Sequence, residues 1–132
     1  MASKGTNADT RYSTGHQSVA DLSASKYRVC RIHSAVAVAT ATGNDVFGIL
    51  GADVDDYSSL AAGQYGVPEI ITFGRATAVA GGVLAADILC MATTAGKLVI
   101  AGSGNLAICR TLEAAGADGD EIAVHVQTIQ AP

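Results

Sequence analysis

A glycine-rich run near the C-terminus has the residue types and spacing that could do chemistry most directly. The residues GSGNLA at positions 102–107 match the pattern G-x-G-x-x-A and follow the apolar run LVIA. The backbone N–H groups of such a loop hold a pyrophosphate when a helix begins directly after it. A helix there would place four side chains on one face: Ile108, Thr111, Leu112 and Ala115. The run is therefore compatible with a nucleotide-binding, Rossmann-like enzyme fragment.

The position of this run in the chain argues against nucleotide binding. A dinucleotide fold needs several βαβ units and usually begins with this motif, whereas here the motif comes last. Asp120 follows the glycines at about the distance in sequence at which a ribose-binding acidic residue stands. The same region also fits a strand, because Leu106, Ile108 and Leu112 alternate with other residues, although Arg110 interrupts the row. We therefore expect no binding of NAD or ATP and assign no cofactor, and keep the nucleotide-binding enzyme as an alternative.

A cluster of carboxylates is the second candidate site. Asp53, Asp55 and Asp56 could bind Ca²⁺, but an EF-hand loop needs glycine where Ser58 stands and a bidentate Glu where Gln64 stands. No CxxC or HxxxH spacing is present either. We interpret the cluster as a solvated acidic loop and predict no metal site.

The histidines give no catalytic set. The chain has three histidines, namely His16, His33 and His125. No Ser-His-Asp or Cys-His arrangement can be assembled around them from the sequence. We therefore name no catalytic residue.

The cysteines are predicted to be buried free thiols of a chain made in a reducing cytoplasm. Cys30, Cys90 and Cys109 are odd in number and form no close pair in the sequence. The alternative for Cys109 is a thiol of lowered pKa, because Arg110 follows it directly.

The elements that must position these residues are predicted to be short strands. Alternating or β-branched residues recur about every 8–12 residues between glycine-rich turns. The strand signals fall at residues 26–33, 34–42, 46–51, 67–80, 83–92, 97–101 and 122–127. Gly74 marks a bulge or bend in the longest run, and residues 93–96 are the turn of a hairpin. These seven or eight strands with almost no helix predict an all-β fold, a small, β-tulip-like barrel or sandwich.

The last strand has the clearest pattern. Three apolar side chains are predicted to face one way, namely Ile122, Val124 and Val126, and three others the opposite way, namely Ala123, His125 and Gln127. Because Ala and Val dominate the hydrophobic residues of the whole chain and Trp is absent, we expect a core of small side chains.

Length and composition indicate one domain with an extended arm. The chain has 132 residues and no apolar stretch near the roughly 18 residues of a membrane span. Its N-terminus has no apolar segment of a signal peptide. Residues 1–26 are polar and without periodicity, so we predict an extended arm that becomes ordered only on a partner, and a β body over residues 27–132.

Charge is distributed unevenly along the chain. Residues 1–33 carry five basic and two acidic groups, whereas residues 34–132 carry three basic and ten acidic groups, so the net charges are +3 and −7. This asymmetry favours a leading segment that meets an acidic protein surface. Nucleic acid is not expected as a partner, because the positive charges are sparse and the acidic body would repel phosphates.

Residues 46–129 resemble the capsid cement, or head decoration, proteins of tailed bacteriophages. The resemblance rests on the order of four segments, which are VFGIL, GRATAVAGGVLAADIL, GKLV and CRTLEAAGADGDEIAVHV. In such proteins a G-I-L strand precedes an Ala-rich strand ending in Gly-Gly, an Asp-led strand and a closing A-x-x-G-D-x-[IV]-x-V strand. Ala86 and Cys109 depart from this pattern, because glycine usually stands at both positions.

The resemblance implies a structural virion protein and not an enzyme. Such a protein binds the outer surface of a phage head, often as a homotrimer, and stabilises the lattice of the major capsid protein. The implied partners are the major capsid protein and further copies of this chain, with no nucleic acid and no membrane. The implied location is the capsid exterior, after synthesis in the cytoplasm of the bacterial host. A phage tail or adaptor component, also β-rich and oligomeric, is a further alternative.

An arm that lies on the capsid is typical of head decoration proteins and gives the polar N-terminal segment a role. We expect Tyr12, Val19 and Leu22 to fill shallow pockets on the capsid, and Lys4 and Arg11 to meet acidic residues around them.

Overall fold

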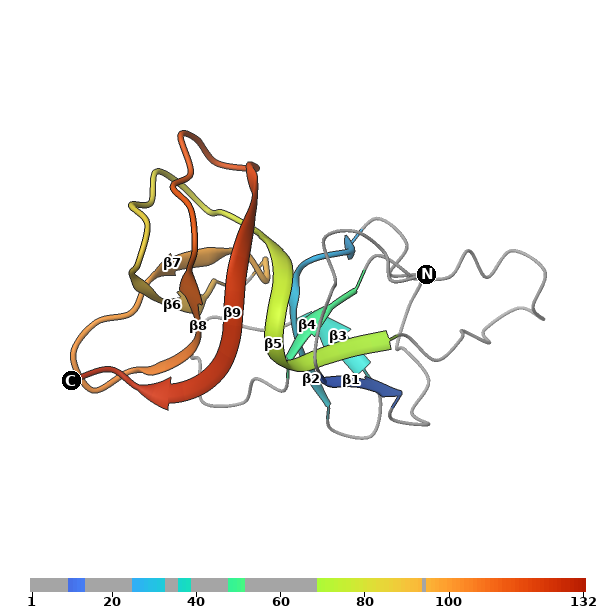
Figure 1. Cartoon of the computed structure of the whole chain (residues 1–132). Helices are drawn as coiled ribbons and strands as arrows, with labels where there is room; N and C mark the ends of the chain where they lie inside the picture. Colours follow the sequence, from blue (N-terminus) through green and yellow to red (C-terminus); the bar gives the residue numbers. More distant parts are fainter. Residues whose placement is uncertain (1–9, 14–24, 33–35, 39–47, 52–68, 94) are drawn as a thin grey trace.

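The structure, a computed structural model, describes residues 10–13, 25–32, 36–38, 48–51, 69–93 and 95–132. Over these residues the chain forms nine β-strands and no α-helix (Figure 1). Their bounds are β1 (Thr10–Ser13), β2 (Val29–Ile32), β3 (Val36–Val38), β4 (Gly48–Leu50), β5 (Glu69–Val79), β6 (Leu89–Ala92), β7 (Leu98–Ile100), β8 (Leu106–Thr111) and β9 (Glu121–Gln130). The described part of the chain contains no helix that is long and apolar enough to cross a membrane. The predicted all-β class is confirmed.

β5 is the central strand of the single sheet, because its two halves have different neighbours. The strand order is β3-β2-β4-β5-β9-β8-β6-β7, and β1 also pairs with β5. In the first half of β5, Ile70 and Ile71 pair with β4 on one edge and with β1 on the other. From Gly74 to Val79, β5 pairs with β9. Gly74 lies at this change of partner with φ 95°, a left-handed conformation that suits glycine, and the predicted bend is confirmed.

Beyond β5 the sheet curls into a half-barrel, seen on the left of Figure 1. β9, β8, β6 and β7 follow in order, and β7 then returns to the end of β5. Ala80 and Leu98 form a parallel bridge there, and Gly81 N donates to Leu98 O at 2.7 Å. A second bridge, between Leu84 and Ala115, joins the two loops that follow β5 and β8. The single curled sheet is closer to a barrel than to a sandwich.

The predicted hairpin of β6 and β7 is also present. The two strands are antiparallel, and Thr93 N donates to Lys97 O at 2.8 Å across their turn. Gly96 has φ 74° in this turn, a conformation that other residues rarely adopt. The strand signal at residues 83–92 is only partly correct, however, because β6 begins at Leu89. The preceding residues are held in a loop by the bridge of Leu84 to Ala115.

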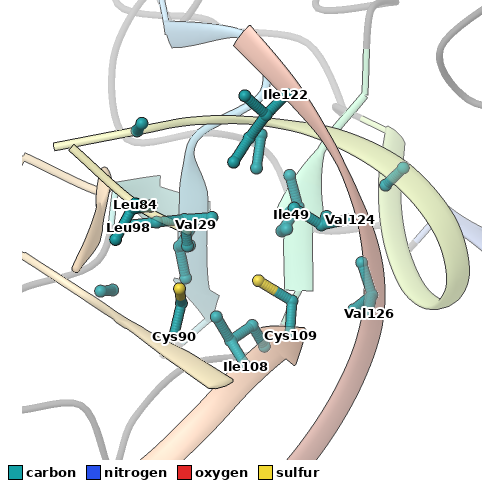
Figure 2. Close-up of a cluster of buried hydrophobic side chains, with 14 of the residues drawn as sticks. Val29, Ile49, Leu84, Cys90, Leu98, Ile108, Cys109, Ile122, Val124 and Val126 are labelled. Carbon is teal, nitrogen blue, oxygen red and sulfur yellow. The ribbon is translucent and has the colours of Figure 1, made fainter. Parts of the chain in front are cut away.

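The core lies inside the curl and extends to β2 and β4 (Figure 2). Ile122, Val124 and Val126 are buried in it, which confirms the predicted inward face of β9. Val29 from β2 and Ile49 from β4 join the same cluster. None of the described members of this cluster is aromatic, so the expected core of small side chains is confirmed.

The region after the glycine-rich run is a strand and not the helix that a nucleotide-binding site would need. A helix over the residues that follow Gly104 is wrong, because Leu106–Thr111 form β8 and pair with β6 and β9. The apolar alternation describes the inward side only in part, since Ile108 is buried in the core cluster whereas Leu112 is exposed. The register of β8 on β9 shifts between Ala107 and Cys109, and after this irregularity Cys109 and Thr111 are the buried residues.

Part of the predicted arm pairs with its own chain. Thr10–Ser13 form β1, an antiparallel neighbour of β5 with Tyr12 opposite Ile70. These four residues are extended, as predicted, but they have a sheet partner within the chain, which the sequence did not lead us to expect. β9 pairs with β5 only from Gly74 onwards, so the preceding residues of β5 are available to pair with β1.

Candidate functional site

Four neighbouring strands bring one row of side chains together on the outward surface of the half-barrel. The register places Leu89 of β6 opposite Arg110 of β8, Arg110 opposite His125 of β9, and His125 opposite Arg75 of β5. We call these four residues the outward row. Their neighbours in sequence, such as Cys90 and Val124, are buried, so alternation along each strand sends the row away from the core.

The outward row concentrates positive charge on an acidic body. Residues 34–132 contain three cationic side chains besides histidine, and two of these, Arg75 and Arg110, are in the row. Arg110 is paired, because its Nη1 lies 3.0 Å from Asp87 Oδ1 and donates to Asp87 O at 3.2 Å. Arg75 is exposed and has no ion-pair partner within the described residues. Arg75 and Arg110 lie on either side of His125 in the row, so two arginines occur close together on this surface.

Apolar side chains surround the row. Phe73, Leu112 and Ile129 are 44%, 47% and 43% exposed, and they are three of the five large hydrophobic side chains that are exposed among the described residues. The Phe73 ring packs edge-on against His125, with centroids 5.1 Å apart and planes at 80°. Exposed apolar side chains that gather around one polar row, as these do, are a feature found in contact sites for other molecules.

A shallow hollow of about 230 Å³ lies in the same surface. It is lined by Leu89, Arg110, Leu112, His125, Gln127 and Ile129. We call the outward row, together with Phe73, Leu112, Gln127 and Ile129, the outward face. Its mixture of apolar and cationic groups suits a partner surface that offers carboxylates beside apolar side chains.

The glycine-rich run is a turn between β7 and β8. Gly104 N donates to Ala131 O at 2.9 Å and Asn105 N donates to Gly102 O at 3.0 Å, so two of the N–H groups that a phosphate would need are already bonded. Asp120 has a structural contact, since its Oδ2 accepts hydrogen bonds from the N–H groups of Gly116 (2.8 Å) and Ala117 (3.1 Å). The carboxylate thereby closes the turn before β9.

The cysteines are buried free thiols, as predicted. Burial raises the pKa of Cys30 to about 12 and that of Cys90 to about 11. Burial also raises the pKa of Cys109 above its ordinary value, and the neighbouring Cys90 raises it further. The alternative of a lowered pKa for Cys109 is therefore wrong, because Arg110 points to the opposite face and contacts Asp87.

Several candidate residues from the sequence lie outside the described residues. These are Lys4, Val19 and Leu22 of the arm, the carboxylates Asp53, Asp55 and Asp56, and the histidines His16 and His33. Arg11 and Tyr12 lie in β1, where the backbone pairs with β5. Among the described residues, no three His, Cys, Asp or Glu side chains are grouped as a metal site requires.

The outward face was not found by sequence reasoning. Each of its members looks ordinary alone, since an Arg, a His or a Phe at alternate positions of a strand is common on solvated sheet faces. The available signal was that Phe73 and Arg75 have the same parity along β5, as do His125 and Gln127 along β9. Only the register of four strands joins these short patterns into one surface.

The fold and the outward face define a small all-β protein with a half-barrel that carries an amphipathic, partly cationic exposed surface. No model of a known protein family matches the sequence, and no curated protein does so either.

Proposed function

We propose that this chain is a capsid decoration, or cement, protein of a tailed bacteriophage. In this function it binds the outer surface of the phage head as a homotrimer and stabilises the lattice of the major capsid protein. The order of the four segments within residues 46–129 supports the family, and the curled all-β body is the kind of fold that the resemblance implies.

The observation that carries the proposal is the outward face. A cement protein has to bind a protein surface, and the outward face offers exposed apolar groups such as Phe73 and Leu112 for burial in a contact. Arg75 and the Arg110–Asp87 pair lie among them. We therefore assign this face to acidic and apolar residues of the major capsid protein, because carboxylates there would complement the guanidinium groups of Arg75 and Arg110.

The N-terminal arm is a second part of the contact in this proposal. Lys4, Arg11, Tyr12, Val19 and Leu22 remain its contact residues. β1 keeps residues 10–13, including Arg11 and Tyr12, on the edge of β5.

Binding to phage heads tests the function directly. Heads assembled without this protein are incubated with the purified chain, and bound protein is measured after sedimentation. We expect saturable binding and a higher temperature for head disruption. Binding to isolated tails but not to heads would favour the tail or adaptor alternative, and binding to neither would refute the proposal.

A charge reversal on the outward face tests its part in this contact. Arg75→Glu should weaken binding to heads about tenfold or more, because it places a carboxylate opposite the acidic partner surface. Lys97→Glu is the matched control, since Lys97 lies in the turn between β6 and β7 and pairs with Asp118, outside both the outward face and the arm. Equal binding by both variants would assign docking to another surface. Deletion of residues 2–9 then tests the arm while it leaves β1 in place.

A further inference from the structure

Two of the three cysteines lie directly opposite each other on neighbouring strands. The register of β6 and β8 pairs Cys90 with Cys109, next to the pair of Leu89 with Arg110. Both thiols point into the core, and Figure 2 shows their sulfur atoms within the same cluster of buried side chains. Cys30 is placed differently, because its partners across the sheet are Val38 and Gly48.

The spacing of a direct cross-strand pair suits a disulfide. Opposite residues of an antiparallel pair have Cα atoms about 4.5 or about 5.5 Å apart, and both values fall within the roughly 4.4–6.8 Å found across disulfides. The Cβ atoms of such pairs are on average slightly further apart than in a disulfide, so the strands must approach by up to about 1 Å. The hydrogen bond from Thr111 N to Ile88 O, at 2.9 Å, belongs to the same ladder and holds this register.

The position of β6 near the edge of the curl gives an oxidant a route to Cys90. β7 has three residues and is the last strand in the order, and on its outer side the described residues provide the isolated bridge of Ala80 to Leu98 in place of a further paired strand. Local opening of such an edge hairpin costs less free energy than global unfolding. Burial keeps both thiols protonated while the hairpin is closed, which makes the reaction slow but not forbidden.

We propose that Cys90 and Cys109 form a redox modification site, in which a peroxide converts the two thiols to a disulfide that ties β6 to β8. The thiolate of Cys90 attacks one oxygen of hydrogen peroxide, the O–O bond breaks, and a sulfenic acid and hydroxide form. The sulfur of Cys109 then attacks the sulfenic sulfur and displaces its oxygen as water. In total, two thiols and one peroxide give one disulfide and two waters. This inference is independent of the partner of the outward face.

The disulfide joins two elements that carry outward residues. Leu89 and Arg110 directly adjoin the two cysteines in sequence and face the opposite way. A bond between β6 and β8 therefore fixes the hairpin against opening and holds this part of the outward row in register.

Oxidation of the full chain tests the proposal. Purified protein is treated with hydrogen peroxide, free thiols are counted in denaturant, and the peptides are mapped by mass spectrometry. We expect two of the three thiols to be lost, a product lighter by two hydrogen atoms, one linked peptide containing Cys90 and Cys109, and full recovery with dithiothreitol.

Single substitutions give the controls. Cys30→Ala should still lose its remaining two thiols to one disulfide, whereas Cys90→Ala and Cys109→Ala should form no intramolecular disulfide. The peptide map of the unaltered chain is independent of how well these variants fold. Three thiols retained after prolonged treatment, a disulfide that involves Cys30, or irreversible oxidation to sulfinic acid would each overturn the proposal.

Discussion

Thr111 provides a sharp test of how the half-barrel is held together. Among the described residues it is the one buried polar side chain, with 1% of its surface exposed. Its Oγ1 accepts a hydrogen bond from Ile88 N at 2.9 Å and donates to Ala85 O at 2.8 Å. The hydroxyl therefore joins β8 to the loop that carries Asp87, the partner of Arg110 on the outward face.

Thr111→Val keeps the shape of the side chain and removes both hydrogen bonds. Ala85 is exposed, so its carbonyl can bond to water, but Ile88 N–H is then left against a methyl group. Leaving one such group without a partner costs about 1–3 kcal/mol, so we expect the free energy of unfolding to fall by about 2 kcal/mol. Thr111→Ser keeps the hydroxyl and loses one buried methyl group, which costs about 1 kcal/mol.

Thermal and urea unfolding, followed by far-UV circular dichroism, measure both variants. For a chain of this size we expect Tm to fall by about 8 °C for Thr111→Val and by about 4 °C for Thr111→Ser. The order of the two variants is the decisive result. If Thr111→Val were as stable as Thr111→Ser or more so, the hydroxyl would not be needed to satisfy Ile88 N–H, and the reasoning would be refuted.

Three further predictions concern pH and glycine. Burial raises the pKa of Cys30 to about 12, so above its ordinary value of 9.0 the unfolded chain releases a proton that the folded chain keeps. The free energy of unfolding should therefore fall as pH rises from about 9 towards 12. In urea titrations, Cys30→Ala should reduce the slope of this fall by up to about 1.4 kcal/mol per pH unit. A slope that is the same in the variant and the unaltered chain would contradict the prediction. Gly48→Ala should lower Tm strongly or prevent folding, because the new Cβ would lie 2.6 Å from the backbone oxygen of Ile71, and a Tm equal to that of the unaltered chain would show that β4 can shift freely. Gly119→Ala should cost about 1 kcal/mol since φ is 94°, whereas Gly82→Ala, with open space and no such φ, serves as its control and should cost far less.

The parts of the fold that the sequence predicted are those that depend on local chemistry. Alternation in the last strand identified Ile122, Val124 and Val126 as inward residues, and Gly74 identified the bend of β5. Both signals arise from neighbours within a few residues, where period and backbone conformation are decided.

The region around β8 could not be read in the same way. Its sequence is compatible with both a helix and a strand. Pairing with β6 and β9 selects the strand, because it provides hydrogen-bond partners for the backbone N–H and C=O groups on both edges. The inward face of β8 was also misleading, because Thr111 is buried through its hydrogen bonds while the more apolar Leu112 is exposed. Residue type alone predicts the reverse, a buried Leu112 and an exposed Thr111.

The candidate site was beyond sequence reasoning for a related reason. His125 meets Arg110 on one side and Arg75 on the other only because β8, β9 and β5 are adjacent and in one register. A shift of one residue in either pairing would send one of the arginines to the core face, where an unpaired charge is strongly unfavourable. The outward row therefore helps to specify the register of the sheet as well as to form the proposed contact surface.

The two faces of β6 and β8 link the proposed contact with the proposed disulfide. Cys90 and Cys109 lie on the inward side of the same backbone segments that hold Leu89 and Arg110 outward. In the reduced chain, opening of the edge hairpin separates Leu89 from Arg110 and disturbs the hollow that they line. A partner that binds the outward face stabilises the closed hairpin and so makes its opening rarer. Because opening admits the oxidant to Cys90, the bound chain should form the disulfide more slowly than the free chain.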